Sequence, residues 1–264
     1  QAVTWYAAAL TMAPADETSR EGMRALLGVK GATRDAASAL AAAYRATDDD
    51  ESLLGLLDHR VSAARDRGEQ ASLLRDAAKL YLDRYKDATS ALGCLCRALP
   101  LEPDNLATES LMMRLAEHTG RWATVAESLR MAGDAAVTTP ARAAQLRLAE
   151  GSVRRRLDDI DAALEAYRAA AQLTPDDAAA LDTLARGGAD AGQWESAAHA
   201  AVQTTAVRDR PVPELLAHLA EQADAREEHA ALAVDGEDRH AAHEALDLEG
   251  GRRAHLGGGG QQQS

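Results

Sequence analysis

The stretch RLDDIDAALEAYRAAAQLTPDD, residues 156–177, holds one full helix pattern and the turn that ends it. Its apolar and small residues recur at steps of three and four, which places them along one face of a helix. These residues are Ile160, Ala163, Leu164, Tyr167, Ala170 and Ala171. Pro175 and the aspartates after it are expected to start the next helix, because proline is tolerated in a first helical turn. The stretch therefore predicts a helix, a tight turn and a second helix.

The same pattern occurs 72 residues earlier in the chain. About 17 of the 56 positions from 71 to 126 hold the same residue as their counterparts 72 positions later. The rarer residue types that coincide are Pro103 with Pro175, Gly120 with Gly192, and Trp122 with Trp194. A repeat at fixed spacing is typical of a solenoid, in which each helix pair buries its apolar face against its neighbours. We expect Trp122 and Trp194 to occupy equivalent buried positions at the starts of equivalent helices.

The composition also favours helices. Among the 264 residues there is no Phe, all aromatic residues together make up 3%, and alanine, the best helix former, is the most abundant residue. A β-sandwich or barrel normally depends on aromatic and β-branched residues, so both are disfavoured. The fold class that we predict is all-α: an α-α superhelix, or solenoid, of antiparallel helix pairs.

The net charge of −13 argues against several classes of partner. An acidic surface repels phosphate backbones and anionic lipids, so we expect neither nucleic-acid binding nor insertion into a membrane. No apolar run approaches the roughly 18 residues that a membrane-spanning helix needs. No signal peptide is visible either, which favours a cytoplasmic location.

One run of residues carries a family resemblance. A small residue is followed by tyrosine or leucine, then alanine, then proline, in Ala163–Tyr167–Ala170–Pro175 and in Ala91–Leu95–Ala98–Pro103. This resembles the tetratricopeptide repeat, a helix–turn–helix unit of about 34 residues. Gly151 matches the helix-start glycine of that family, and Gly120 and Gly192 match its turn glycine. Long arrays of this type occur in bacteria with GC-rich genomes, and 26 arginines against three lysines fit such a coding bias.

The chain is expected to divide into three parts. Residues 1–207 form the repeat array, 208–248 a degenerate helical cap, and 249–264 a flexible Gly/Gln-rich tail. The helices expected in the array cover 2–12, 17–28, 34–46, 51–66, 70–84, 88–101, 106–118, 122–134, 141–156, 160–173, 178–190 and 194–207. The first of these is similar to the second helix of a repeat, which predicts that the chain is a fragment of a longer protein.

Residues that could carry chemistry are sparse. His240 and His243 beside Glu244 lack the spacing of a known zinc motif, and solvated helix positions are the better interpretation. Cys94 and Cys96 lack C-x-x-C spacing and are interpreted as small helix residues. We expect no metal, no cofactor and no catalytic residue. The prediction is a non-enzymatic scaffold that binds a protein or peptide partner; the alternative is the regulatory segment of a larger signalling enzyme, such as a kinase, whose catalytic domain lies elsewhere.

The resemblance also implies where a partner would bind. In tetratricopeptide superhelices the first helix of each pair lines a concave groove, and five arginines fall on such positions here. They are Arg84, Arg114, Arg155, Arg156 and Arg186. Arginine can hold an acidic peptide or a terminal carboxylate by forked hydrogen bonds. The alternative is that they are ordinary solvated residues paired with Asp83, Glu117 and Asp190. The lysine and asparagine of the carboxylate clamp known in some members are absent.

Overall fold

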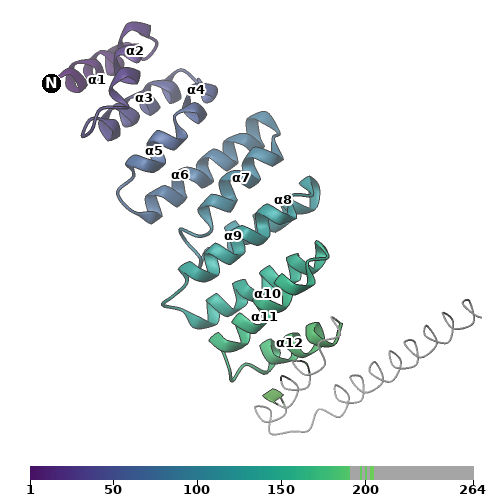
Figure 1. The fold of residues 1–264 in the computed structure, drawn as a ribbon. Helices are drawn as coiled ribbons and strands as arrows, with labels where there is room; N and C mark the ends of the chain where they lie inside the picture. The colour runs from purple at the N-terminus through teal and green to yellow at the C-terminus, as the bar shows by residue number, and fades with distance from the viewer. Residues whose placement is uncertain (191–196, 198–199, 201–202, 205–264) are drawn as a thin grey trace, which may run out of the picture.

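The computed structural model describes residues 1–190 and, beyond them, residues 197, 200, 203 and 204. Within these residues every regular element is a helix, and successive helices form an extended stack of antiparallel pairs (Figure 1). The predicted all-α solenoid is confirmed. The helices are α1 (Ala2–Met12), α2 (Glu17–Leu26), α3 (Thr33–Ala46), α4 (Asp50–Gly55), α5 (Leu57–Ala63), α6 (Arg67–Leu80), α7 (Ala88–Ala98), α8 (Leu106–Thr119), α9 (Trp122–Ala135), α10 (Pro140–Arg156), α11 (Ile160–Leu173) and α12 (Ala178–Asp190).

Two predicted helices differ from the structure. The helix expected at 51–66 is divided into α4 and α5 at Leu56, directly after Gly55, which has low helix propensity. Both Leu56 and Leu57 are buried, so the break lets two successive apolar residues reach the interior. The helix expected at 70–84 begins at Arg67 because Asp66 caps it, and it ends in a π-helical turn, Tyr81–Tyr85.

Polar side chains at the N-termini fix where the helices begin. Asp87 and Asp159, which are 72 residues apart, cap α7 and α11 by accepting backbone N–H bonds. Pro175 lies in the turn and does not start the next helix, contrary to the sequence interpretation. The Asp177 carboxylate accepts the N–H of Ala179 instead, which satisfies a donor that the helix leaves unpaired. Gly120 ends α8 in a left-handed conformation (φ 69°), as its turn position predicts.

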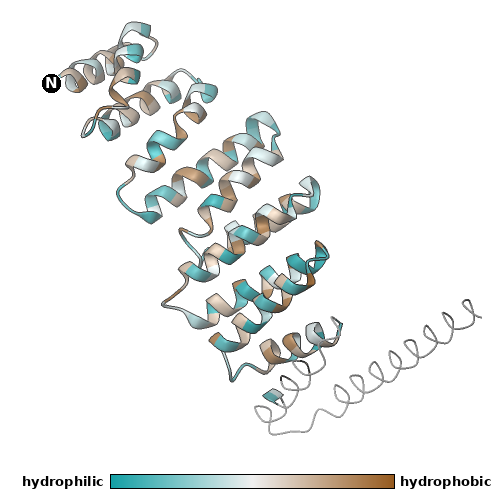
Figure 2. Ribbon diagram, in the orientation of Figure 1, coloured by the Kyte–Doolittle hydropathy of each residue, from teal (hydrophilic) through white to brown (hydrophobic). Residues whose placement is uncertain are grey.

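The buried side chains form three clusters in succession along the stack. Their largest members are Met23, Leu40 and Tyr44 in the first, Leu74, Leu95, Leu129 and Leu146 in the second, and Leu164, Tyr167 and Leu181 in the third. Apolar residues correspondingly line the sides of the helices that face one another (Figure 2). Each helix therefore depends on its neighbours for burial, as in other solenoids.

Gly151 is not at the start of a helix, as the family resemblance implied, but in the buried interior of α10. Its function there is to make room for an aromatic ring. A Cβ atom at this position would lie 2.3 Å from Cε1 of Tyr167, and one at Gly187 in α12 would lie 2.9 Å from Cδ2 of the same ring. The Tyr167 ring is thus held between two glycines of neighbouring helices.

Trp122 begins α9 as predicted, but it is half-buried and not buried. The guanidinium of Arg156 lies 4.5 Å from the centre of its ring, and this stacking keeps one face of the indole near the surface. Trp194 and Gly192 lie outside the described residues, as do the cap expected at 208–248, the tail at 249–264 and His240 with His243. None of the described helices is both long and apolar enough to cross a membrane.

Candidate partner-binding surface

The first helices of the pairs are α6, α8, α10 and α12, and they alternate with the second helices α7, α9 and α11 (Figure 1). The polar positions that the repeat assigned to the groove are indeed exposed on α8 and α10. On α8 they are Ser110, Arg114, Glu117 and His118; on α10 they are Gln145, Ser152, Arg155 and Arg156. These side chains belong to the solvent face of each helix and are available to a partner.

Arg156 joins α10 to α8. One of its terminal nitrogens donates to a carboxylate oxygen of Glu117 at 2.7 Å, while the plane of its guanidinium covers the ring of Trp122. Both partners lie at the end of the α8–α9 turn, 34 to 39 residues before the arginine in sequence. An ion pair and a cation–π contact therefore fix the direction of this guanidinium.

Arg155 joins the same helix to α12. Its guanidinium donates to the carboxylate of Asp190 at 2.8 Å. On α12 itself, Arg186 donates to Asp182, one helical turn earlier, at 2.7 Å. Charged side chains thus follow one another from α8 through α10 to α12. We call Arg114, Arg155, Arg156 and Arg186 the arginine row.

Arg84 does not belong to this row. It lies in the π-helical turn after α6, and its Nε is 3.3 Å from a carboxylate oxygen of Asp50 at the start of α4. The pairings with Glu117 and Asp190 are those that the sequence alternative named, whereas the expected pairing of Arg84 with Asp83 is replaced by Asp50. No contact brings Arg84 to the arginines of α8, α10 or α12 within the described chain.

Arg114 differs from the other members of the row. It is exposed in the middle of α8, and it has neither a hydrogen bond nor an ion pair with any residue that the structure describes. It precedes Glu117 by three residues, so the two side chains lie on the same face of the helix. The free guanidinium therefore stands beside the Glu117–Arg156 pair.

These pairs stabilise the fold little and are easily exchanged. The side chains of Arg155, Arg156 and Arg186 are 46%, 53% and 65% exposed. Exposed ion pairs contribute about 0–1 kcal/mol each, because water screens the attraction and ordering the side chains costs entropy. A carboxylate from a partner can replace Glu117 or Asp190 at small cost.

Chemistry of other kinds has little support in the described part of the chain. No group of three or more His, Cys, Asp or Glu side chains there is placed to hold a metal ion. Cys94 and Cys96 are both buried free thiols in α7. Burial raises the pKa of both, that of Cys96 to about 12, so neither thiol is poised as a nucleophile.

Sequence reasoning missed two features of this region. Trp122 was expected to be core, and its contact with Arg156 was not foreseen. Arg142 of α10 is 8% exposed, and it ties that helix to the preceding pair by donating to the Pro103 carbonyl and the Glu109 carboxylate. The spacing of 33 residues between Glu109 and Arg142, about one repeat, is the signal that could have revealed this pair.

Comparisons with known proteins add weak structural likenesses. No protein-family model matches the chain, and no curated protein matches it. A crystal structure of MamA protein is 14% identical, with 64% of this chain and 88% of that chain covered at a TM-score of 0.37. BtubC from P. vanneervenii is 16% identical, with 79% and 92% covered at a TM-score of 0.36.

The C-terminal part of a TPR repeat-containing protein from Cytophaga hutchinsonii is 13% identical, with 76% of this chain and 78% of that chain covered at a TM-score of 0.36. Scores this low carry no argument about the chain, so the assignment rests on its own geometry. By its antiparallel helix pairs, its 72-residue spacing and its glycine-ended turn, the chain is a tetratricopeptide-like helical repeat protein.

Proposed function

We propose that the chain is a non-enzymatic scaffold that binds a protein partner on the exposed face of α8, α10 and α12, through carboxylates of that partner. The observation that carries this proposal is the free guanidinium of Arg114 beside the weakly held pairs of Arg155 and Arg156. Repeat arrays present extended surfaces of this kind, which suit an extended or helical segment of a partner.

The chemistry favours arginine over lysine at these positions. A guanidinium offers a planar fork of donors that matches the two oxygens of a carboxylate, whereas an ammonium is a point charge. Because the net charge of the whole chain is −13, its long-range field does not attract an acidic segment. Recognition therefore depends on short-range forked hydrogen bonds at the arginine row, and it should weaken as salt is added.

The test begins with a partner captured from a lysate of the source and identified by mass spectrometry. Its affinity is then measured for the wild-type chain and for the double variant Arg114→Gln with Arg156→Gln. We expect at least about tenfold weaker binding, since each forked contact to a carboxylate contributes about 1–3 kcal/mol. The thermal melt should hardly change because both side chains are exposed.

Arg130→Gln is the matched control. Arg130 belongs to the second helix α9 and pairs with Glu127 and Asp134 on that helix, so it is a paired arginine outside the row. This variant should bind the partner as the wild-type chain does. Equal affinity of the double variant and the wild-type chain would refute the proposed surface.

A further inference from the structure

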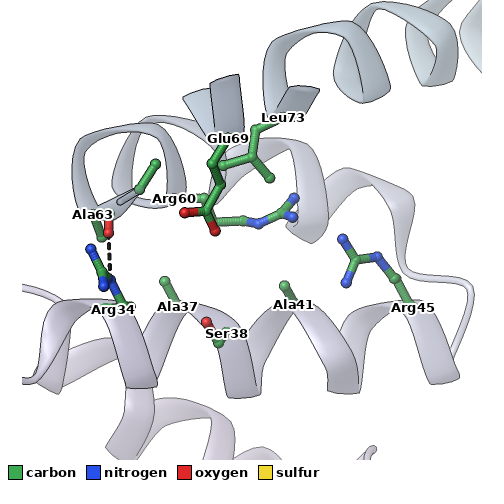
Figure 3. A pocket seen from close by; sticks show the side chains of 10 residues that line it. Arg34, Ala37, Ser38, Ala41, Arg45, Arg60, Ala63, Glu69 and Leu73 are labelled. Carbon is green, nitrogen blue, oxygen red and sulfur yellow. Dashed lines mark hydrogen bonds between the residues drawn. The ribbon is translucent and has the colours of Figure 1, made fainter. Parts of the chain in front are cut away.

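A pocket of about 130 Å³ lies between α3, α5 and α6, away from the arginine row (Figure 3). Three arginines line it, Arg34 and Arg45 from α3 and Arg60 from α5, and Glu69 of α6 is the single acid of its lining. Most of the rest of the wall is small, including Ala37, Ala41, Ala63 and Ala64. The pocket is therefore cationic and has room only for a compact group.

Arg60 is the exceptional residue of this pocket. Every other arginine that is buried or half-buried in the described part of the chain has a hydrogen-bond or ion-pair partner. These are Arg20, Arg75, Arg130, Arg142, Arg147, Arg154 and Arg168. Arg60 is half-buried and forms neither a hydrogen bond nor an ion pair with a described residue. A guanidinium withdrawn from water without a partner costs free energy.

The surroundings of Arg60 do not offset its charge. Burial is the main reason why the pKa of Arg60 is lowered, and the like charge of Arg45 is the next. The acids that act against this are Asp76 and Glu69, but neither lies within ion-pair distance of Arg60. Glu69 is already engaged, because its carboxylate accepts the backbone N–H of Arg65 at 2.7 Å.

The other two arginines complete a ring of donors around the pocket. Arg34 donates from Nε to the Ala63 carbonyl at 2.7 Å, which anchors its guanidinium at one end. At the other end the guanidinium groups of Arg45 and Arg60 point toward each other (Figure 3). Arg45, like Arg60, has no ion pair with a described residue. Two like charges facing each other in this way attract an anion between them.

We propose that this pocket binds a phosphate group, as the dianion. Three guanidinium groups against the single charge of Glu69 leave the lining with two positive charges, which match a dianionic phosphate. A carboxylate carries only one charge and would leave one of these uncompensated. The tetrahedral oxygens can accept from guanidinium forks on several sides, and the alanine wall excludes a bulky ligand. This site is independent of the proposed partner surface, because it shares no residue with it.

Titration calorimetry on the full chain tests the proposal with inorganic phosphate, a short peptide that carries one phosphoserine, and acetate, at constant ionic strength. We expect saturable binding of inorganic phosphate at millimolar concentration or below, and acetate at least about tenfold weaker. Arg60→Gln should weaken phosphate binding at least tenfold. In the absence of phosphate its melting temperature should stay the same or rise, because the variant removes an uncompensated charge.

Arg114→Gln is the matched control, since Arg114 is also unpaired but lies on α8, and it should bind phosphate as the wild-type chain does. Binding of both inorganic phosphate and the phosphopeptide indicates a phosphate presented by a partner; binding of inorganic phosphate alone indicates the free ion. Absence of phosphate binding, equal affinity for acetate, or an Arg60→Gln variant with wild-type affinity would each overturn the proposal.

Discussion

The helix pairs α6–α7 and α10–α11 are equivalent by the 72-residue spacing, yet the residue at the centre of each pair differs in size. In α11 it is Tyr167, and in α7 it is Leu95; both are 2% exposed. The tyrosine ring lies between Gly151 and Gly187, whereas the positions 72 residues before those glycines hold Lys79 and Leu115.

This difference shows that the repeat conserves the filled volume of a contact and not the residues that fill it. Protein interiors are closely packed, so a larger side chain on one helix requires smaller ones on its neighbours. Leu95 needs no glycine opposite it because its side chain is short. The predictions below test this account of the two pairs, beginning with the largest expected effect.

Removing the smaller central residue should have the greatest effect. Leu95→Ala is expected to lower the free energy of unfolding by about 2–5 kcal/mol, because it removes buried methyl groups and leaves a cavity. Chemical denaturation measures this change. Leu106→Ala, at an exposed leucine that begins α8, is the control and should change stability little. A loss below about 1 kcal/mol for Leu95→Ala would mean that this position is not central.

Filling the space beside Tyr167 should be the next largest effect. Gly151→Ala is expected to destabilise the chain by about 1–3 kcal/mol, since the added methyl group would overlap the buried ring. Tyr167→Leu in the same chain should recover part of this loss, because the equivalent pair tolerates leucine without glycine. A double-mutant cycle by denaturation measures the coupling.

Gly93→Ala provides the matched control for Gly151→Ala. Gly93 lies inside α7, and nothing lies within 4 Å of an added Cβ atom there. The helix propensity of alanine should therefore stabilise this variant by up to about 1 kcal/mol. Destabilisation of both glycine variants to the same extent would contradict the packing account.

The capping aspartates of the two pairs should differ in their acid titration. Asp87 accepts the Ser90 hydroxyl at 2.6 Å and two backbone N–H groups, whereas position 162, the counterpart of Ser90, is alanine. The Ser90 hydrogen bonds are the main reason why the pKa of Asp87 lies below its usual 3.8. Its stabilisation of the fold is therefore present above pH 3.8 and is lost as the pH falls through the lower, folded-state pKa.

An NMR titration of the carboxyl carbon measures this directly. Ser90→Ala should raise the pKa of Asp87 toward 3.8 and make the stability of the chain less dependent on pH in the acid range. An unchanged Asp87 pKa in the Ser90→Ala variant would show that the hydroxyl is not its cause.

The smallest effect is expected at the surface. Arg156→Gln should lower the free energy of unfolding by less than about 1 kcal/mol, because its pair with Glu117 is exposed. Thermal melts of this variant and the wild-type chain measure the difference. A loss of several kcal/mol would show that the arginine row holds the helices together, and it would remove the argument that a partner can displace these pairs.

Much of the fold follows from local patterns in the sequence. The helices 160–173 and 178–190 begin and end as predicted, because the apolar period, the capping aspartates and the loops all lie within each repeat. The break at Leu56 did not follow, since two adjacent leucines are compatible with a continuous helix until their burial against other helices is known. The role of Gly151 escaped for the same reason, because Tyr167 lies 16 residues away on another helix.

The candidate site was predictable only in part. The repeat placed the arginines on the first helices, but it did not say which carboxylate meets each one. Arg84 pairs with Asp50, 34 residues earlier and two helices away, and Arg156 stacks on Trp122. The isolation of Arg60 is likewise invisible in sequence, because it depends on the absence of an acid in space.

The central claim is that a partner occupies the exposed face of the first helices. Hydrogen–deuterium exchange of the chain, alone and saturated with the captured partner, tests this most directly. The account predicts slower exchange in peptides from α8, α10 and α12, with little change in α9 and α11. Protection confined to α9 and α11 would contradict it and would place the partner on the opposite face of the array.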